Sequence, residues 1–397
     1  MKKILLLGGS AQQIIAIETA KRLGYYTVLC DFLEDNPGQF VADKFYLIST
    51  TNKDAILKVA QQECIDGILA YASDPAAPTA AYVAEKLGLI SNSYEAVETL
   101  CNKDKFRDFL RSNGFNSPKS CGYNSLEDVY NDIGTFRLPI IIKPVDSSGS
   151  KGVTVLNSHN ALDDALKYAF SYSRTNRIII EEYVEKKHKY LVGGDIFVKD
   201  GKIILWGLLN CHRDSEVNPL VPVGKSYPLA LDNDDICSIK KVLQNLVEKL
   251  NIQSGAMNIE LIVDRNGDVW PIDIGPRNGG NMIPDLLGLI FNVDIVEWSV
   301  KTAMNEIIPE TIKAENLYYA THNLHSKCNG VFKDIIFDQE LEKKIIRKCI
   351  YKSKGDSIEY FDNASKALGI IFMKFINEEE MHCCLENIED KISIVLS

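Results

Sequence analysis

The first ninety residues alternate short apolar runs with stretches of helical periodicity, and no other feature of the sequence restricts the fold as strongly. Strand-like apolar runs cover residues 4–7, 27–30, 45–48 and 67–71. Windows with helical periodicity lie between or after them, at residues 11–23, 54–63 and 78–87. Strands that alternate with helices predict βαβ units and therefore a parallel sheet. We expect an N-terminal α/β domain over residues 1–95.

Small and polar residues stand at the carboxyl ends of these strands. Gly8-Gly9-Ser10, Asp31 and Ser73-Asp74 each follow a strand-like run. Ligands of parallel sheets bind beyond such ends, so we expect the domain to face a ligand there. Gly8-Gly9-Ser10 hints at dinucleotide binding, but GxGxxG is absent. A tight βα turn or a substrate-facing loop is the favoured interpretation of these three residues.

Charge and cysteine usage narrow the class of protein. The chain has 44 Lys and Arg against 54 Asp and Glu, a formal net charge of −10, whereas proteins that bind nucleic acids through bulk electrostatics usually carry the opposite sign. No apolar run approaches the roughly 20 residues of a membrane span, and residues 4–7 are too few for a signal peptide. The ten cysteines show no CxxC and no regular spacing. We therefore expect reduced thiols in a cytoplasmic protein without nucleic-acid or membrane partners.

From about residue 96 the pattern changes toward antiparallel strands. A helix that carries Lys103 and Lys105 ends near Gly114. Strand-like runs then follow at residues 138–144, 153–156, 177–180, 203–209, 256–263 and 269–274. Residues 264–268, Asp-Arg-Asn-Gly-Asp, favour a hairpin turn between the last two. After about residue 305, the sequence predicts strands near 369–375 and a helix near 378–384.

Lys143 ends an otherwise apolar strand and precedes a loop of small residues. A lone buried ammonium is costly, so Lys143 must reach solvent, a carboxylate or an anionic ligand. The backbone N–H groups of such a loop can cradle phosphate oxygens, although GxxxxGK[ST] does not fit. Taken separately, a snorkelling lysine and an ordinary hairpin connection explain these features. The small residues of the loop are Ser147, Ser148, Gly149, Ser150 and Gly152.

Acidic residues follow or lie on three further strands. Glu181-Glu182-Tyr183-Val184 follows a buried strand and is either a strand reaching solvent or a hinge that meets a purine edge. Glu260 and Asp273 can stand on the same face of the hairpin closed by residues 264–268. Like charges so placed repel unless a proton is shared or a cation lies between them, and hard oxygen ligands suit Mg²⁺. Arg277, four residues after Asp273, is either a surface ion pair or a group that steadies a developing anion.

The order of these features along the chain resembles that of the ATP-grasp superfamily over roughly residues 1–300. The features are Lys103, Lys143 with its loop, the Glu-Glu-Tyr-Val segment, Glu260 and the Asp-x-Gly-Pro-Arg segment at 273–277. The resemblance is closest to the branch that contains biotin carboxylase, the carbamoyl-phosphate synthase large chain and the L-amino-acid ligases. It implies a mixed α/β and α+β fold. The parallel-sheet domain is followed by a two-lobed ATP-grasp core over residues 96–304 and a small α+β domain over residues 305–397.

The resemblance also implies the roles of individual residues. Lys103 and Lys143 contact nucleotide phosphates, with Lys105 as a competitor for the first role, and the loop closes over the triphosphate. Glu260 and Asp273 hold one or two Mg²⁺ ions, while Arg277 and Lys143 act in catalysis. Main-chain groups and a carboxylate of the hinge hold adenine; the hinge residues are Glu181, Glu182, Tyr183 and Val184.

The ribose contact and the metal-ligand segment do not match the family pattern in full. The ribose contact falls on His188 or, alternatively, on Glu185. The usual Glu-x-Asn-Pro-Arg is here Asp273-Ile274-Gly275-Pro276-Arg277, in which Gly275 offers no side-chain ligand. Either a second Mg²⁺ binds more weakly, or Asn278 or Asn258 replaces the missing ligand. The departure bears on the number of metal ions more than on nucleotide binding.

Other candidates carry weaker signals. His322 and His325 lie three residues apart in a predicted strand without an acidic neighbour, which argues against a metal site. A nucleophilic Cys211 finds no support, whereas His212 and Arg213 are candidates for contacts to substrate or phosphate. We expect the Pro- and Gly-rich stretch 214–228 to be a mobile active-site loop.

The resemblance implies a ligase. ATP phosphorylates a carboxylate to an acyl phosphate, an amine displaces phosphate, and ADP is released. Its partners are small-molecule carboxylates and amines, and related proteins suggest a homodimer. Two alternatives remain open: bicarbonate as the acid, as in carboxylases, and a nucleotide-binding module without turnover. The identities of acid and amine are not encoded in any motif.

Overall fold

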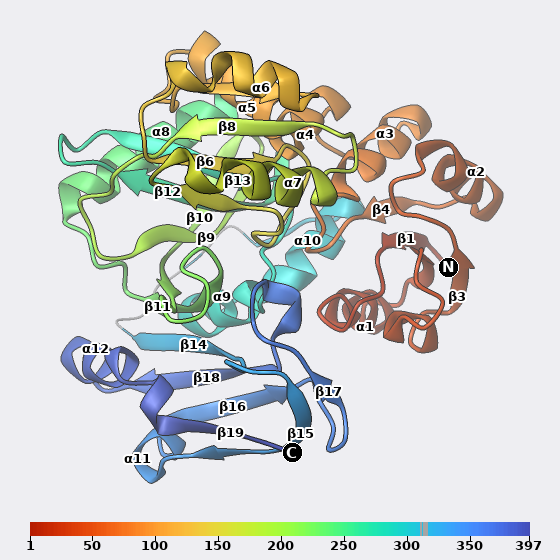
Figure 1. Ribbon diagram of the computed structural model, residues 1–397. Helices are drawn as coiled ribbons and strands as arrows, with labels where there is room; N and C mark the ends of the chain where they lie inside the picture. Colours follow the sequence, from red (N-terminus) through yellow and green to blue (C-terminus); the bar gives the residue numbers. More distant parts are fainter. Residues whose placement is uncertain (310–311, 313–316) are drawn as a thin grey trace.

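The computed structural model describes residues 1–309, 312 and 317–397. Its strands form four sheets, with the N-terminal sheet at the right of Figure 1, a small lobe at the top and the C-terminal strands at the bottom. No helix among the described residues is both long and apolar enough to cross a bilayer.

The N-terminal sheet is parallel, as the sequence predicts. Its order is β3-β2-β1-β4, and one face packs against α2 and α3. The other face packs against α1 and against α10 (Ile295–Ala303), which comes from far along the chain. The remaining bounds are β1 (Lys3–Leu7), α1 (Ile14–Arg22), β2 (Tyr26–Asp31), η1 (Pro37–Phe40), β3 (Lys44–Leu47), α2 (Lys53–Glu63), β4 (Gly67–Leu69) and α3 (Ala77–Leu87).

The small lobe is an antiparallel sheet with the order β5-β8-β6-β7. One of its faces is buried against α6 and α7, with Ile140, Ile142 and Ile180 in that core. The lobe's elements are β5 (Ser120–Tyr123), α6 (Leu126–Asp132), η2 (Ile133–Thr135), β6 (Ile140–Pro144), β7 (Thr154–Leu156), η3 (His159–Ala161), α7 (Leu162–Tyr172) and β8 (Ile178–Glu182). Two helices, α4 (Tyr94–Cys101) and α5 (Lys103–Ser112), lead from the N-terminal domain into it.

The large lobe is built on an eight-stranded antiparallel sheet with the order β13-β12-β9-β10-β11-β14-β18-β16. Alternate residues of its strands face opposite layers: Ile259 and Leu261 pack toward α5 and α8, whereas Phe197 and Leu209 pack toward α9 and α10. The elements are β9 (Leu191–Lys199), β10 (Lys202–Arg213), β11 (Pro222–Tyr227), α8 (Asn233–Lys249), β12 (Ser254–Val263), β13 (Val269–Gly275), α9 (Ile283–Phe291), β14 (Tyr318–Leu324), β16 (Ile345–Ile350) and β18 (Gly369–Phe375).

The C-terminal region continues this sheet. β14 pairs with β11 on one side and with β18 on the other, so the ladder crosses the boundary expected near residue 304. A three-stranded sheet, β17-β15-β19, adds to it. The outer elements are β15 (Gly330–Phe337), α11 (Gln339–Glu342), β17 (Ser357–Ile358), η4 (Ala364–Lys366), α12 (Glu378–Glu386), η5 (Glu389–Lys391) and β19 (Ile392–Leu396).

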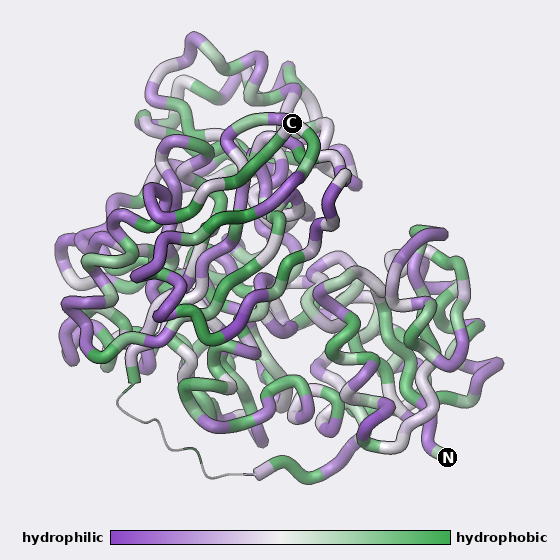
Figure 2. The backbone as a smooth tube through the Cα atoms, turned by 90° about the horizontal axis from the view of Figure 1, so that it is seen from below, coloured by the Kyte–Doolittle hydropathy of each residue, from purple (hydrophilic) through white to green (hydrophobic). Residues whose placement is uncertain are grey.

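The expectation that residues 214–228 form one mobile loop is wrong for the second half of that stretch. Residues from Pro222 to Tyr227 form β11, a central strand of the large sheet. Val221 and Val223 are buried, and their apolar contacts outweigh the turn signals of the neighbouring proline and glycine. Figure 2 shows the same pattern throughout: hydrophobic segments gather in the strands, and hydrophilic ones in the peripheral turns.

Candidate active site

Lys143 and Glu181 meet across two neighbouring strands of the small lobe. Lys143 in β6 and Glu181 in β8 are buried, and Lys143 Nζ lies 2.7 Å from Glu181 Oε2. The guanidinium of Arg107, fully buried in α5, donates from Nε to Glu181 Oε1 at 2.8 Å. Arg107 was not predicted from the sequence, although its position one helical turn after Lys103 was a usable signal. The three side chains leave one positive charge uncompensated.

The pKa values of this group follow from burial and charge. Burial lowers the pKa of Lys143, and the Glu181 carboxylate opposes that shift. Burial alone would raise the pKa of Glu181, but Arg107 and Lys143 hold it at about 2. Arg107 also donates from Nη2 to the Ile272 carbonyl at 2.6 Å, which ties α5 to β13 beside Asp273. The cluster therefore joins the small lobe to the strand that carries a predicted metal ligand.

Lys103 connects the Gly/Ser-rich loop with Asp273. It is the first residue of α5, and its Nζ donates to the Ser147 carbonyl at 2.7 Å. The same Nζ lies 3.7 Å from Asp273 Oδ2. Lys105, the competitor for this position, pairs instead with Glu98 at 2.9 Å on an exposed part of the chain.

The loop after β6 reaches across to the large lobe. Ser147 Oγ donates to the Lys151 carbonyl at 2.9 Å, which closes the loop on itself. Ser150 Oγ donates to the carbonyl of Leu220 at 2.8 Å, and Leu220 lies just before β11. Ser148, Gly149 and Gly152 lie in the same connection between β6 and β7. The loop therefore lies over the space between the two lobes.

Two of the predicted hinge residues, Glu182 and Tyr183, already form hydrogen bonds within the small lobe. Arg137 donates to Glu182 Oε2 from Nη2 at 2.7 Å, and this pairing lowers the pKa of Glu182. The N–H of Tyr183 donates to the Pro139 carbonyl at 2.9 Å. Among the described residues, no acceptor takes the N–H of Val184. Val184 is therefore the hinge residue whose N–H can still meet a purine edge.

His188 bonds to the main chain through both ring nitrogens. Its Nε2 accepts from the Val263 N–H at 3.0 Å, and its Nδ1 donates to the Tyr190 carbonyl. Burial lowers its pKa, in keeping with a neutral ring. Glu185, the alternative for the ribose contact, is exposed and lies 3.3 Å from Arg265. The geometry therefore favours Glu185 over His188 for a ligand contact.

Glu260 and Asp273 are cross-strand partners in the β12–β13 ladder, as their spacing from the turn predicts. Glu260 Oε1 lies 3.4 Å from Arg213 Nη2. Burial would raise the pKa of Glu260, but Arg213 and Lys225 lower it. The ladder therefore places the two carboxyl groups side by side, in position to hold one cation.

Lys225 in β11 is a further cationic group that the sequence analysis did not single out. It is buried, and its Nζ lies 2.5 Å from the Cys211 thiol. Gly193, the cross-strand partner of Glu260, leaves room for it, because a Cβ there would lie 2.9 Å from Lys225 Nζ. Among the described residues no carboxylate lies within 4.0 Å of this ammonium. A buried ammonium without an anion is a binding position for one.

Arg277 forms an ion pair with Asp74 of the N-terminal domain. Its Nε and Nη2 lie 2.7 and 2.5 Å from the two carboxylate oxygens of Asp74. Burial alone would lower the pKa of Arg277, but the Asp74 carboxylate raises it. Gly275 makes this pair possible, since a Cβ there would lie 2.4 Å from Asp74 Oδ1. The place where the family pattern has an asparagine side chain is therefore filled by Asp74.

The two asparagines considered as replacement ligands differ in position. Asn258, the cross-strand partner of Gly275, donates from Nδ2 to Asp195 at 2.9 Å and leaves its oxygen for other contacts. Asn278 is 1% exposed, and its oxygen accepts from Ser299 Oγ at 2.8 Å. Asn258 is therefore the better placed of the two.

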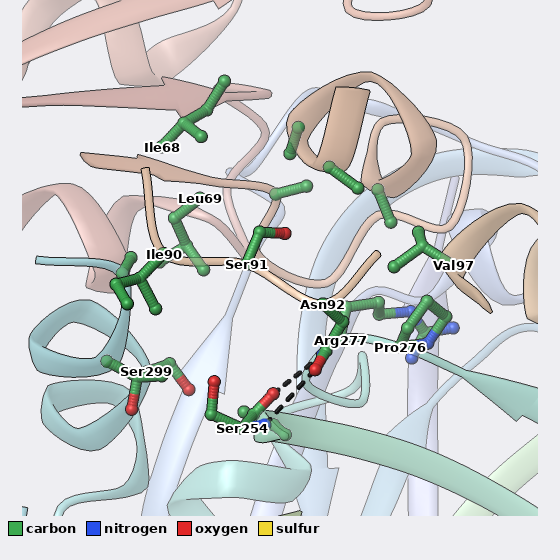
Figure 3. A pocket seen from close by; sticks show the side chains of 18 of the residues that line it. Ile68, Leu69, Ile90, Ser91, Asn92, Val97, Ser254, Pro276, Arg277 and Ser299 are labelled. Carbon is green, nitrogen blue, oxygen red and sulfur yellow. Dashed lines mark hydrogen bonds between the residues drawn. The ribbon is translucent and has the colours of Figure 1, made fainter. Parts of the chain in front are cut away.

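A pocket of about 100 Å³ lies on the N-terminal side of Arg277, where the α/β domain meets the large lobe (Figure 3). Ile68 and Ile90 come from the N-terminal domain, and Pro276 and Ser299 from the core. Asn92 closes one side by donating to the Ser254 carbonyl at 2.8 Å. Arg277 and Asn278 line this pocket, whereas Lys103 and Lys143 do not.

Residues 136–285 match the protein family described as ATP-grasp domain. The formate-dependent phosphoribosylglycinamide formyltransferase of Prochlorococcus marinus (strain NATL1A) is 35% identical over 191 residues, 46% of this chain and 48% of that protein. The chain thus aligns with about half the length of this curated relative.

The fold matches solved structures over the whole chain. An L-amino acid ligase from Bacillus licheniformis aligns with a TM-score of 0.83 at 19% identity, covering 100% of this chain and 99% of that one. The biotin carboxylase domain dimer of the Hydrogenobacter thermophilus 2-oxoglutarate carboxylase, solved with MgADP, ADP and bicarbonate, aligns with a TM-score of 0.74 at 16% identity over 100% and 91% of the chains. Residues 136–285 are therefore identified as an ATP-grasp domain, within a chain whose overall fold is that of these solved structures.

Proposed function

We propose that this chain is an ADP-forming ligase that phosphorylates a carboxylate with ATP and joins the acyl group to an amine. The observation that supports this function is the position of Lys103. Its Nζ lies 2.7 Å from the Ser147 carbonyl in the loop and 3.7 Å from Asp273 Oδ2 on the metal-binding face. A triphosphate beside this ammonium would touch the loop on one side and the Glu260–Asp273 pair on the other.

The nucleotide would lie between the two lobes. Lys103 and Lys143 would neutralise phosphate charge, and the loop would cover the triphosphate from above. The free N–H of Val184 would donate to adenine, and Glu185 would accept from the ribose hydroxyls. The ligand of the neighbouring biotin carboxylase domain, MgADP, supports this class of nucleotide.

Glu260 and Asp273 would hold Mg²⁺. They offer oxygen ligands on neighbouring strands, and Mg²⁺ prefers one or two carboxylates together with phosphate oxygens and water. Asn258, the cross-strand partner of Gly275, would offer its amide oxygen to a second ion. When bound, Mg²⁺ would neutralise charge on the phosphates of ATP.

The reaction would depend on positioning and charge. A carboxylate oxygen of the acid forms a bond to the γ-phosphorus as ADP leaves. The amine nitrogen then forms a bond to the acyl carbon, and phosphate leaves with the proton that the nitrogen loses. Arg277 and the unpaired Lys225 would stabilise the anions of both steps. A homodimer belongs to the proposal, supported by the dimeric neighbour.

Bicarbonate is the second candidate for the acid. The observation that favours it is the neighbouring carboxylase domain that was solved with bicarbonate. Lys225 and Arg213 on the same face as Glu260 could bind so small an anion without a larger pocket. In that case the activated species would be carboxyphosphate.

The test measures ADP and phosphate released from Mg-ATP, with pooled carboxylates and amines and then with bicarbonate. Hydroxylamine is added in place of the amine, because it converts an acyl phosphate to a stable hydroxamate. We expect hydroxamate with one class of acid, and ADP formation that requires acid and amine together. Bicarbonate-dependent ADP would select the second candidate. ATP binding without ADP in any pool would overturn both and leave a nucleotide-binding module.

A further inference from the structure

Two buried histidines meet two carboxylates beside the active-site face. His322 lies in β14 and His325 directly follows that strand, and both side chains are at most 4% exposed. Glu389 is the first residue of η5, and Asp214 directly follows β10. The ligand atoms of His322, His325 and Glu389 all lie within 4.8 Å of one another. Three elements that are distant in sequence thus bring imidazole and carboxylate donors to one point.

Three pairs of these donor atoms lie close enough together to share one metal ion. His325 Nε2 lies 3.1 Å from Asp214 Oδ2 and 3.7 Å from Glu389 Oε2. His322 Nε2 lies 3.3 Å from Glu389 Oε1. Zn²⁺ bonds of about 2.0–2.2 Å to nitrogen and oxygen place tetrahedral ligands roughly 3.3–3.6 Å apart. His322, His325 and Glu389 therefore already form one group of donors, and Asp214 would complete a tetrahedron by moving toward it.

The tautomer of His325 supports a cation between these groups. Its Nδ1 lies 2.7 Å from the Asn323 carbonyl, which only accepts, so the proton of the neutral ring is on Nδ1. Nε2, the ring nitrogen that remains, faces the carboxylates of Asp214 and Glu389, where it could share a cation with them. Metal-bound histidines commonly donate their other N–H to a backbone carbonyl in this way. The ring is therefore oriented for ligation.

Few cations lie near these donors. Among the described residues, Lys327 is the one lysine or arginine within 4.0 Å of the Asp214 or Glu389 carboxylates. Lys327 Nζ lies 4.0 Å from Asp214 Oδ2 but forms its closer ion pair with the exposed Glu216. A divalent cation would relieve the repulsion better than one distant ammonium.

We propose that His322, His325, Asp214 and Glu389 bind one divalent first-row transition metal, with Zn²⁺ as the best match to two imidazoles and two carboxylates. The proposal is independent of the proposed ligase reaction. Imidazole ligands distinguish this site from the Glu260–Asp273 pair, whose oxygen ligands suit Mg²⁺. The ion would cross-link β10, β14 and η5. It would also fix the chain next to Arg213, which reaches Glu260 at 3.4 Å.

The sequence analysis argued against this site because no acidic residue lies beside the two histidines. The structure supplies the acids from elsewhere, since Asp214 and His325 are 111 residues apart. Sheet topology brings them together: β10 pairs with β11, and β11 pairs with β14.

The experiment measures metal retention by the full chain. Protein stripped with chelator is dialysed against Zn²⁺ or Co²⁺ in excess Mg²⁺, which blocks the Glu260–Asp273 pair, and metal is quantified by mass spectrometry. We expect one equivalent per chain and the intense visible d–d bands of tetrahedral Co²⁺. Thiolate-to-cobalt charge transfer in the near ultraviolet should be absent. Its presence would assign the metal to cysteine and overturn the proposal.

Variants locate the ion. Glu389→Gln keeps the shape of a partly exposed side chain, and His325→Ala removes a buried ligand. Each should weaken Co²⁺ binding by more than the roughly 10–100-fold that loss of an outer partner costs. His159→Ala removes an exposed imidazole of the small lobe and should bind as wild type. Cys328→Ser removes an exposed thiol three residues after His325 and should also bind as wild type. No retained metal in the wild type, or equal retention in Glu389→Gln and His325→Ala, would overturn the proposal.

Discussion

Gly275 shows how a residue in one domain can be constrained by a side chain from another. Its missing Cβ is the space that Asp74 occupies while it pairs with Arg277. The departure from the family's asparagine is therefore linked to Asp74, and the arginine keeps a partner from the N-terminal domain. A substitution at Gly275, Asp74 or Arg277 should therefore alter the contacts of the other two residues.

We expect Gly275→Asn to destabilise the protein by about 1–3 kcal/mol, because the new side chain displaces Asp74 from Arg277. Asp74→Ser, which removes the clashing carboxylate, should recover part of that loss in the double variant. Urea unfolding of the wild type, both single variants and the double variant measures the coupling. Simply additive changes would contradict the steric account.

Arg277 and Lys143 should separate turnover from nucleotide binding. Arg277→Ala should leave ATP affinity close to wild type and lower turnover by roughly 100–1000-fold, since a donor to the developing anion is lost. Lys143→Ala should weaken ATP binding by roughly 10–100-fold, equivalent to about 1.5–3 kcal/mol for a hydrogen bond to a charged group. Calorimetric ATP titration and ADP release measure the two effects.

Lys105→Ala is the matched control for the lysine, because Lys105 is exposed and pairs with Glu98. It should bind ATP as the wild type does. Unchanged turnover in Arg277→Ala would remove Arg277 from the mechanism, whereas weaker ATP binding there would make it a nucleotide ligand.

At the scale of elements, β8 carries two adjacent glutamates in opposite environments. Glu181 is buried between Arg107 and Lys143, and Glu182 pairs with Arg137, whose side chain is 88% exposed. Strand alternation directs them to opposite faces of the small sheet. Two adjacent residues of one strand therefore form a buried ion-pair cluster and a surface ion pair.

We expect Glu181→Gln to destabilise the protein by about 3–5 kcal/mol at pH 7, because two buried cations lose their counter-charge. The pKa of Glu181 is about 2 when folded and about 4.3 when unfolded. Its ionic contribution is thus complete above pH 4.3 and disappears as the pH falls toward 2.

Chemical unfolding at several pH values between 7 and 3 measures this difference, which should narrow steadily below pH 4.3. Glu182→Gln on the same strand is the control, and its effect should stay within about 1 kcal/mol because its pair is exposed. A difference for Glu181→Gln as large at pH 3 as at pH 7 would contradict an ionic origin.

Elements with local signals could be predicted from the sequence, and long-range contacts could not. The Glu260–Asp273 register was predictable because the turn at 264–268 fixes it within one hairpin. The Arg277–Asp74 pair joins residues 203 apart, and no periodicity encodes it. β11 was missed because its proline and glycine are turn signals that burial in a central strand overrides. The ATP-grasp domain itself was identified correctly, because its motifs are ordered along the chain.

At the scale of the molecule, one sheet runs through both the large lobe and the C-terminal region. β14 is hydrogen-bonded to β11, and Tyr319, Ile370 and Phe372 share a core with α9 and α10. α10 in turn packs against the N-terminal sheet. The three predicted units therefore share buried surfaces.

We expect removal of residues 305–397 to leave a chain that does not fold stably, because the edge of β11 and the apolar face of α9 become exposed. The full chain should unfold in one cooperative transition by calorimetry. The truncated chain should show none and should aggregate. A truncated chain that unfolds cooperatively and still binds ADP would show that the core is independent.

The shared ladder between β11 and β14 also has a consequence for evolution and engineering. A C-terminal region that adds strands to the core sheet cannot be exchanged as an independent domain. Any replacement region must reproduce the strand register from Gly224–His322 to Tyr227–Tyr319. New specificities in this lineage should therefore arise by substitution within the inherited scaffold rather than by recombination of whole segments. Chimeras cut between β11 and β14 should fail more often than chimeras cut within surface turns.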